Sequence, residues 1–205
     1  IGDAGKATLT FARESGFFNV ATVRDPYRVE GMKTMGYEVA EQLGWRLPDA
    51  IVYPTGGGEG TIGIWKAIGE MLDWGWLPRE TPRPRMIIAQ AAGCSPLVRA
   101  FRAGEEKATP WEDPTTHASG LRVPGPLGDR LTLRTLRESG GEAEAVHEDA
   151  IRSGTFLLAS KSGIDAAPEG GAALEATRQL VAAGRLSRDA EVVVFNTGSG
   201  ASYRW

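Results

Sequence analysis

The sequence predicts an α/β domain with a mostly parallel sheet and helices on both of its faces. Short β-branched runs alternate with longer segments of helical periodicity, which is the order that a parallel sheet requires. The short runs are apolar throughout, as is typical of strands buried on both faces. With 205 residues, of which 41% are hydrophobic and 24% are charged, the chain can form one substantial core.

Gly, Pro and Asn residues mark the boundaries of the expected elements. Strands are expected at residues 18–23, 50–53, 86–91, 143–146 and 191–195. Helices are expected at residues 27–43, 61–74, 96–102, 129–138, 149–159 and 171–183. Residues 103–128 hold four prolines and four glycines, and this segment is too long for an ordinary connector. We therefore expect it to be either functional or mobile.

Composition narrows the class of protein. The 23 basic and 26 acidic residues give a net charge of −3 without a cluster of Lys and Arg, so nucleic-acid binding is not expected. No apolar run approaches the roughly 20 residues that cross a bilayer, so no membrane span is expected. Cys94 is the single cysteine and is interpreted as a small buried residue. His117 and His147 are interpreted as surface or capping residues, and no metal site is expected.

The most informative stretch is a glycine loop between a strand and a helix. The strand ends at Pro54, four glycines follow within residues 56–60, and the helix is expected to begin at about Thr61. Glycine allows positive φ and a close approach to a ligand, and a helix start offers unpaired N–H groups and positive dipole character. The loop therefore predicts an anion site suited to phosphate. Thr61 is expected to cap the helix and to donate its hydroxyl to a phosphate oxygen.

Two familiar phosphate loops do not fit this stretch. A nucleoside-triphosphate loop needs Gly-Lys followed by Ser or Thr, and Lys66 lies too deep in the helix. A dinucleotide loop needs an acidic residue at the end of the next strand, where this chain has Gln90. A single phosphate monoester is the ligand that remains. The alternative is a tight strand-to-helix turn that binds nothing.

Four segments of the chain resemble one enzyme family. They are residues 24–38 (RDPYRVEGMKTMGYE), 54–61 (PTGGGEGT), 167–173 (APEGGAA) and 195–200 (FNTGSG). In this order and spacing they are similar to the pyridoxal-phosphate enzymes of the tryptophan-synthase β fold (fold type II), and within it to the threonine synthases. The resemblance implies that fold, pyridoxal 5′-phosphate as cofactor, a cytoplasmic location and a homodimer.

The resemblance also implies roles for particular residues. The cofactor phosphate would be bound by the loop residues Gly56, Gly57, Gly58, Glu59, Gly60 and Thr61. Glu59 would contribute its backbone N–H, because its carboxylate would repel phosphate. Thr197 would meet the pyridine nitrogen, unless it simply ends the last strand. Arg28, with Arg24 beside it, would bind the substrate's phosphate, unless both are solvated arginines at a helix start.

The family's Schiff-base lysine has no counterpart in this chain. That lysine is expected well over a hundred residues before the glycine loop, whereas 55 residues precede Gly56. The five lysines are Lys6, Lys33, Lys66, Lys107 and Lys161, and none has a suitable setting, so no catalytic residue is assigned. We expect a C-terminal portion of a longer enzyme, inactive alone, in which residues 1–22 end the small mobile domain and residues 23–205 form most of the large cofactor-binding domain. A complementary fragment or a degenerate module are the alternatives.

Three functions follow as hypotheses. The first is a threonine synthase, a pyridoxal-phosphate-dependent lyase that converts O-phosphohomoserine and water into threonine and phosphate. The second is another fold type II enzyme, of the dehydratase or cysteate synthase type. The third is a module that binds a phosphorylated ligand without catalysis. The expected partner in the first case is a phosphorylated amino acid.

Overall fold

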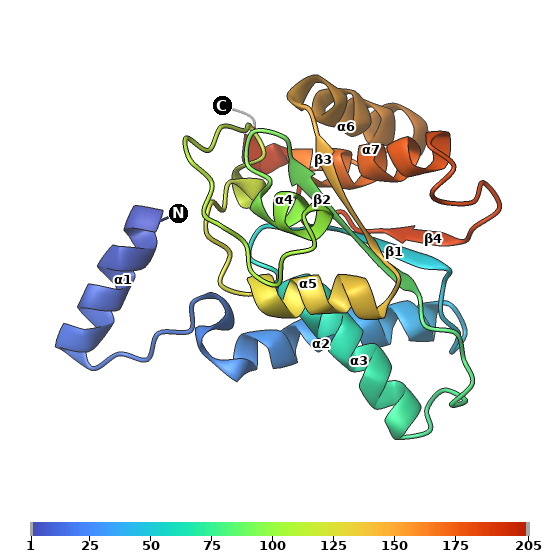
Figure 1. The fold of residues 1–205 in the computed structure, drawn as a ribbon, viewed down its shortest axis with the longest axis horizontal. Helices are drawn as coiled ribbons and strands as arrows, with labels where there is room; N and C mark the ends of the chain where they lie inside the picture. The colour runs from blue at the N-terminus through green and yellow to red at the C-terminus, as the bar shows by residue number, and fades with distance from the viewer. Residues whose placement is uncertain (1, 204–205) are drawn as a thin grey trace.

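A computed structural model describes residues 2–203 and has a parallel four-stranded sheet at its centre (Figure 1). The strands are β1 (Ala50–Pro54), β2 (Arg85–Ala91), β3 (Glu142–Val146) and β4 (Val192–Val194), in the spatial order β3-β2-β1-β4. In the register of the sheet, Val52 pairs with Ile87 on one side and with Val194 on the other. The α/β class and the parallel sheet are thus confirmed.

Helices cover both faces of the sheet and enclose a hydrophobic core on each (Figure 1). One layer contains α2 (Pro26–Gln42), α3 (Glu59–Asp73), α4 (Pro96–Arg102) and α5 (Asp129–Glu138), and the other contains α6 (Glu148–Ser162) and α7 (Pro168–Ala182). Alternate residues of each strand serve opposite cores. Ile51 packs in the core below α3, and its neighbour Val52 packs in the core below α7. This double burial explains why the strands read as continuous apolar runs.

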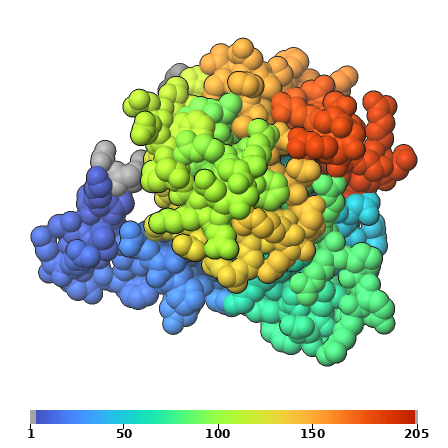
Figure 2. Space-filling model, in the orientation of Figure 1, coloured from blue at the N-terminus to red at the C-terminus, as the bar shows by residue number. Residues whose placement is uncertain are grey.

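The N-terminal part differs from the expectations in two ways. Residues 18–23 form no strand, because the chain there is an exposed connection that ends in the short 3₁₀ helix η1 (Thr22–Arg24). The helix α1 (Gly2–Ser15) was not expected at all. It lies outside the two helical layers, at one end of the molecule (Figures 1 and 2). The ring of Phe11 stacks on the ring of Phe17 at 5.8 Å, and both remain exposed.

The remaining helices and strands match their expected positions closely. The expected bounds of α4 and α5 agree with the structure, and the other boundaries differ by at most three residues. The largest shifts, of three residues, are at the end of α6 and at the start of α7, which begins at Pro168, where a proline suits the first helical position. Two further short 3₁₀ helices are η2 (Ser119–Leu121) and η3 (Gly200–Tyr203). None of the helices within residues 2–203 is long and apolar enough to cross a membrane.

Candidate functional site

The glycine loop connects β1 to α3 at the carboxyl end of the sheet. Its first residue, Thr55, donates its N–H to the carbonyl of Ala89 in β2 at 2.9 Å. The helix begins at Glu59 rather than at about Thr61, and its N-cap is Gly58, with φ 104°. Only glycine adopts this conformation without strain, so Gly58 is fixed by the turn itself.

The expectation that Thr61 caps α3 is therefore wrong. Thr61 is fully buried inside the first turn, and its hydroxyl lies 3.0 Å from the hydroxyl of Thr55. The Thr55 hydroxyl also lies 3.0 Å from the Tyr53 carbonyl, to which it donates. These contacts keep the Thr61 hydroxyl below the loop surface. Its backbone N–H is then the group that Thr61 can offer to an anion.

Neighbouring chain segments press against the glycines of the loop. A Cβ on Gly56 would collide with the Gly120 carbonyl, and one on Gly58 would collide with the Thr132 hydroxyl. A Cβ on Gly60 would collide with the ring of Tyr53. Close packing alone thus explains much of the glycine density. A ligand role must rest on the hydrogen-bonding groups of the loop rather than on its glycine count.

Those groups are the backbone N–H groups of residues 56–61. Within the described part of the chain, none of these six N–H groups donates a hydrogen bond, and three of them form the first turn of α3. Unpaired N–H groups at a helix N-terminus bind anions, and phosphate is the usual one. The Glu59 carboxylate is folded back against Gly57, where a Cβ would collide with it. The N–H groups of the loop fit a phosphate, although the negatively charged Glu59 carboxylate lies beside them.

Gln90 holds the start of this loop from below. Its amide nitrogen donates to the Thr55 carbonyl at 3.1 Å, and its amide oxygen accepts the N–H groups of Leu97 at 2.9 Å and Val98 at 3.2 Å. The fully buried side chain thereby joins the end of β1 to the first turn of α4. The sequence showed only that Gln90 is not acidic, and its structural role emerges from the three-dimensional contacts.

Thr197 lies at the same end of the sheet as the glycine loop. It follows β4, which is the parallel neighbour of β1, and the Phe195 N–H donates to the Val52 carbonyl at 3.0 Å. The exposed Thr197 lines a cavity of about 290 Å³, together with Pro54 and Gly120. Gly120 also abuts Gly56, so one short segment contacts both predicted parts of the site.

Glu169, at the start of α7, anchors that segment. The carboxylate is only 7% exposed and accepts the Gly120 N–H at 2.8 Å and the Tyr203 hydroxyl at 2.5 Å. Burial, followed by the hydrogen bond to Glu169, raises the pKa of Tyr203, so its hydroxyl stays protonated as a donor. The Ser119 hydroxyl lies 2.8 Å from the Tyr203 hydroxyl. The sequence pattern placed Glu169 in a matched segment but did not reveal this contact.

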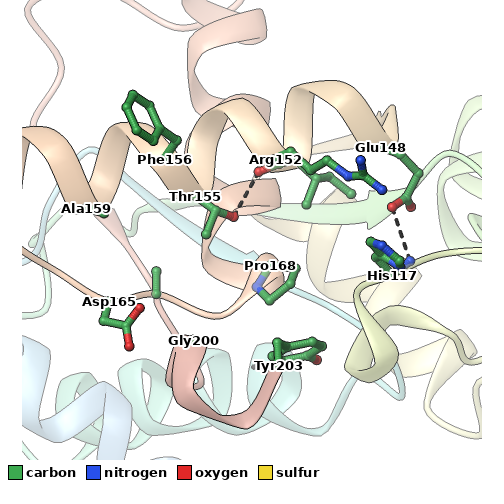
Figure 3. A pocket seen from close by; sticks show the side chains of 12 residues that line it. His117, Glu148, Arg152, Thr155, Phe156, Ala159, Asp165, Pro168, Gly200 and Tyr203 are labelled. Carbon is green, nitrogen blue, oxygen red and sulfur yellow. Dashed lines mark hydrogen bonds between the residues drawn. The ribbon is translucent and has the colours of Figure 1, made fainter. Parts of the chain in front are cut away.

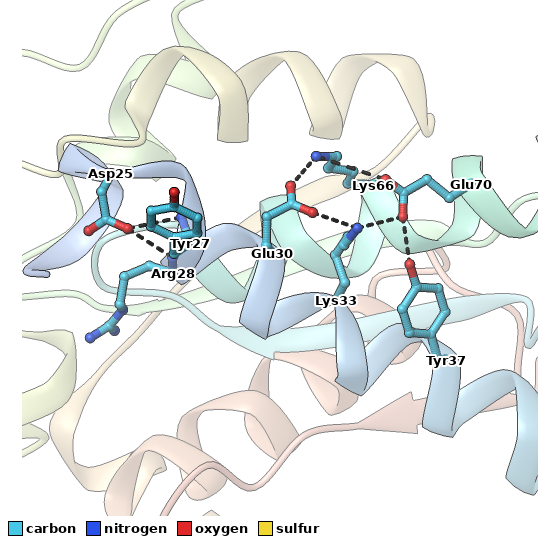
Figure 4. A network of polar contacts seen from close by, with 8 residues as sticks. All are labelled: Asp25, Tyr27, Arg28, Glu30, Lys33, Tyr37, Lys66 and Glu70. Atoms are coloured by element: carbon cyan, nitrogen blue, oxygen red, sulfur yellow. Dashed lines mark hydrogen bonds and ion pairs between the residues drawn. The ribbon is translucent and has the colours of Figure 1, made fainter.

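Arg28 is within electrostatic reach of Tyr53, whose ring abuts Gly60, although neither Arg28 nor Arg24 makes a hydrogen bond or ion pair with the loop among the described residues. Asp25 accepts the N–H groups of Tyr27 at 2.9 Å and Arg28 at 3.3 Å, which caps α2 (Figure 4). Burial and the Glu59 charge raise the pKa of Tyr53, and the positive charge of Arg28 opposes that rise. Arg28, Tyr53 and Glu59 therefore share one electrostatic environment at the start of α3.

Lys33 belongs to an ion-pair network rather than to the cavity (Figure 4). Its ammonium group lies 2.6 Å from Glu30 and 2.7 Å from Glu70, and Tyr37 donates its hydroxyl to Glu70 at 2.5 Å. Lys66 also pairs with Glu30. Hydrogen bonds to Glu30 and then Glu70 raise the pKa of Lys33 well above 10.5. A lysine held protonated in this way is unsuited to attack a carbonyl group.

The remaining titratable candidates do not form a second reactive centre. Cys94 is buried, and burial raises the pKa of its thiol, so it stays protonated. His117 and His147 are both exposed, as expected. Across residues 2–203, no three His, Cys, Asp or Glu side chains are grouped so that they could hold a metal ion.

Comparisons with known proteins identify the family of the chain. The family model described as pyridoxal-phosphate dependent enzyme matches residues 1–198. The threonine synthase of Methanosarcina acetivorans is 37% identical over 174 residues, which are 85% of this chain and 42% of that protein. The threonine synthase of Methanocaldococcus jannaschii is 34% identical over 176 residues, or 86% of this chain and 43% of that protein. The chain thus spans less than half the length of these two relatives.

Solved structures share the fold. The processed form of threonine deaminase isoform 2 from Solanum lycopersicum superposes with a TM-score of 0.74 at 17% identity, covering 93% of this chain and 48% of that chain. An L-serine ammonia-lyase from Rhizomucor miehei superposes with a TM-score of 0.67 at 24% identity, covering 86% and 55% respectively. Both likenesses concern the architecture of the chain, because identity at this level carries the fold alone.

Proposed function

Because this chain belongs to the pyridoxal-phosphate dependent enzyme family, we propose that its glycine loop binds the cofactor's phosphate and that Thr197 contacts the pyridine nitrogen. The proposal rests on one observation above all. Six consecutive N–H groups without partners, at residues 56–61, lie at the same end of the sheet as the exposed Thr197 and the cavity that it lines. The N–H groups and the α3 dipole would neutralise the phosphate charge.

Residues of the chain would also set the chemistry of the bound cofactor. When bound, pyridoxal phosphate serves as an electron sink for the α-carbon of an amino-acid substrate. The Thr197 hydroxyl can hydrogen-bond the ring nitrogen but does not enforce its protonation as a carboxylate would. The pyridine ring of the cofactor would therefore withdraw electrons less strongly, which favours elimination and replacement reactions. Glu169 would position the Gly120 segment that closes the cavity beside Gly56.

We propose the threonine synthase reaction, O-phosphohomoserine and water to threonine and phosphate, for the complete enzyme to which this chain corresponds. The two threonine synthase relatives support it, and so does the exposed Arg28, whose guanidinium has no ion-pair partner among the described residues. A guanidinium fork near the loop suits a substrate phosphate. Arg24 is a weaker candidate, because no described interaction directs it toward the loop.

The chain by itself would supply the cofactor-binding part of this activity. None of its five lysines takes the Schiff-base role in the proposal, and Lys33 is fixed in ion pairs. Residues 1–22 would belong to the small mobile domain and residues 23–205 to the large domain. A homodimer in the cytoplasm is the assembly we propose for the complete enzyme.

Phosphate recognition can be tested on the chain as it stands. Pyridoxine 5′-phosphate is the suitable probe, because it lacks the aldehyde that would react with surface lysines. We expect saturable binding in calorimetry, with pyridoxine, which lacks the phosphate, binding at least tenfold more weakly. A Thr197→Val variant should weaken binding about threefold to tenfold, the loss of roughly one hydrogen bond. Equal binding of the two probes would contradict the phosphate role of the loop.

Reaction type is a separate measurement on the complete enzyme. Phosphate released from O-phosphohomoserine indicates a threonine synthase, whereas ammonia released from serine or threonine indicates a dehydratase. An Arg28→Gln variant should raise the KM for the phosphorylated substrate and leave the affinity for the cofactor unchanged. A variant with unchanged KM would remove Arg28 from the proposal.

A further inference from the structure

Three exposed tryptophans gather where the C-terminal ends of α2 and α3 meet. Trp45 follows α2, and Trp74 and Trp76 follow α3. They are 48%, 56% and 51% exposed respectively, and we call the three together the aromatic patch. A tryptophan side chain covers up to about 250 Å², so the patch exposes roughly 400 Å² of mostly apolar surface. That area is comparable with the largest patch on a typical monomer, and such patches are often functional.

The rings of the aromatic patch are held in place by one another and by the backbone. The Trp76 ring lies at the centre, with its centroid 5.9 Å from that of Trp45, 5.5 Å from that of Trp74 and 5.7 Å from that of Tyr37. The Trp76 N–H donates to the Met71 carbonyl at 2.9 Å, which fixes the connection after α3. Aromatic side chains that are already ordered lose little conformational freedom on binding, and tryptophan is prominent among the residues that dominate protein–protein interfaces.

Trp45 has a backbone conformation that a tryptophan rarely adopts. Its φ is 59°, directly after Gly44 at φ 75°. The Trp45 N–H donates to the Ala40 carbonyl at 2.7 Å, which holds this turn at the end of α2. A glycine would adopt the left-handed conformation without strain, so the tryptophan is present at a cost in stability. A strained residue of this kind indicates that the exposed indole has a role beyond ending the helix.

The aromatic patch contains both a cavity and a projecting side chain. Among the described residues, Trp45 and Trp76 line a cavity of about 380 Å³, and their rings meet at 88°. An indole in the corner between them would stack on one ring and present its edge to the other, and both arrangements are favourable. Among the same residues, Trp74 is outside this lining and is the most exposed of the three tryptophans. Each chain therefore carries a cavity for an indole and an indole that its own cavity does not use.

We propose that the aromatic patch is the interface through which two copies of this chain associate. Trp74 of each copy fills the cavity of the other copy, so the contact occurs twice about a two-fold axis. A patch that carries both complementary parts matches a second copy of itself. The two patches would bury roughly 800 Å² of aromatic surface, about half of a standard interface, and the polar residues around them would form the rim.

The surroundings of the aromatic patch are compatible with this dimer. Arg46, directly after Trp45, forms a bidentate ion pair with Glu191, so this pair adds no net charge that would repel a second copy. The patch lies at the opposite end of α3 from the glycine loop, about 22 Å away along this 15-residue helix (Figure 1). The inference therefore supplies an interface for the proposed homodimer and does not rest on the proposed cofactor site.

Sedimentation equilibrium of the unmodified chain tests the association. We expect a reversible monomer–dimer equilibrium, in which the mean mass rises from 21.9 kDa toward twice that value at about 10–100 μM. Tryptophan fluorescence should change over the same concentrations, because Trp74 leaves the solvent. A mass that stayed at 21.9 kDa up to about 1 mM would overturn the proposal.

Two variants assign the contact. Trp74→Ala removes the projecting indole, and Trp45→Gly removes one wall of the cavity and also relieves the left-handed strain. A dimer of either variant loses both copies of the contact, so its dissociation constant should rise at least about a hundredfold, or tenfold per contact. Phe156→Ala is the matched control, because Phe156 is an exposed aromatic side chain on α6, in the other helical layer (Figure 3). This variant should dimerise as the unmodified chain does.

A mixture of the two variants tests whether the contact is reciprocal. The Trp74→Ala chain keeps its cavity and the Trp45→Gly chain keeps its projecting indole, so a mixed dimer retains one of the two contacts. It should dissociate only about tenfold more readily than the unmodified dimer. A mixture that associated no better than either variant alone would contradict the proposal, and so would unchanged dimerisation of both variants. Unchanged far-UV circular dichroism would show that the variants are folded without reference to cofactor binding.

Discussion

The helix α3 carries two polar regions that differ in one respect. At its N-terminal end, the backbone N–H groups of residues 56–61 have no partners among the described residues. Further along, Lys66 and Glu70 join Lys33, Glu30 and Tyr37 in a network in which each charged group has a partner. Satisfied polar groups hold two helices together, whereas unsatisfied ones are kept available for a ligand. The same helix thus shows where the fold is stabilised and where it can act.

The largest expected effect concerns Gly58. A Gly58→Ala substitution forces an L-residue into φ 104° and places a methyl group against the Thr132 hydroxyl. We expect a loss of about 2–3 kcal/mol in the free energy of unfolding, measured by urea denaturation, together with loss of pyridoxine 5′-phosphate binding. In the same helix, Gly69 faces open space. Gly69→Ala should instead stabilise the chain by about 0.5–1 kcal/mol. Equal effects of the two substitutions would show that the turn does not need glycine.

The next largest effect is expected for Glu70 and distinguishes the role of the ion-pair network in stability from the role of the loop in ligand binding. Glu70→Ala removes the acceptor shared by Lys33 and Tyr37 and should lower the free energy of unfolding by about 1–2 kcal/mol. Binding of pyridoxine 5′-phosphate should not change, because Glu70 lies about two and a half turns beyond Thr61. Glu80→Ala is the control, since Glu80 is exposed and should matter by less than about 0.5 kcal/mol. Weaker ligand binding in the Glu70 variant would show that the two regions are coupled.

The stability contributed by this network depends on pH in a defined direction. Burial opposes ionisation of Glu70, but hydrogen bonds from Lys33 and Tyr37 prevail and lower its pKa below 4.5. Its contribution is therefore present above pH 4.5 and is lost as the pH falls through the lowered value. The raised pKa of Lys33 keeps that group's contribution fully present below pH 10.5.

Denaturation of the unmodified chain and of Glu70→Ala across pH measures this dependence. The difference between them should stay constant from about pH 6 to pH 9 and shrink in acid below pH 4.5. A difference that persisted unchanged at pH 2 would mean that packing, rather than charge, accounts for the effect of Glu70.

The sequence predicts the features of the fold that depend on local patterns. Periodicity and boundary residues located four strands and six helices, because these depend on local burial pattern. The strand expected at residues 18–23 failed because its apolar side chains have no sheet to join. The glycine loop was recognisable because its demands on backbone conformation are local. The expected role of Thr61 was wrong because α3 begins two residues earlier than expected. Thr61 therefore lies inside the first turn as a buried side chain and does not cap the helix.

The contacts that close the site were beyond sequence reasoning. Glu169 binds Gly120 across 49 positions of chain, and Gln90 joins the start of the loop to α4. Neither partner is implied by its neighbours in sequence. Such long-range hydrogen bonds form because the strands bring distant segments of the chain to one edge of the sheet. The residue types of the bonded partners do not by themselves predict these bonds.

The smallest expected effect tests the charge at the loop itself. The Glu59 carboxylate lies against Gly57, beside the N–H groups that are proposed to bind phosphate. Two like charges about 4 Å apart in water repel by about 1 kcal/mol, so Glu59→Gln should tighten pyridoxine 5′-phosphate binding up to about fivefold. The gain should diminish at high salt, which screens the repulsion. Pyridoxine, which has no phosphate, should show no gain. If Glu59→Gln weakened phosphate binding instead, the carboxylate would be organising the loop, and the loop's N–H groups would depend on it for their position.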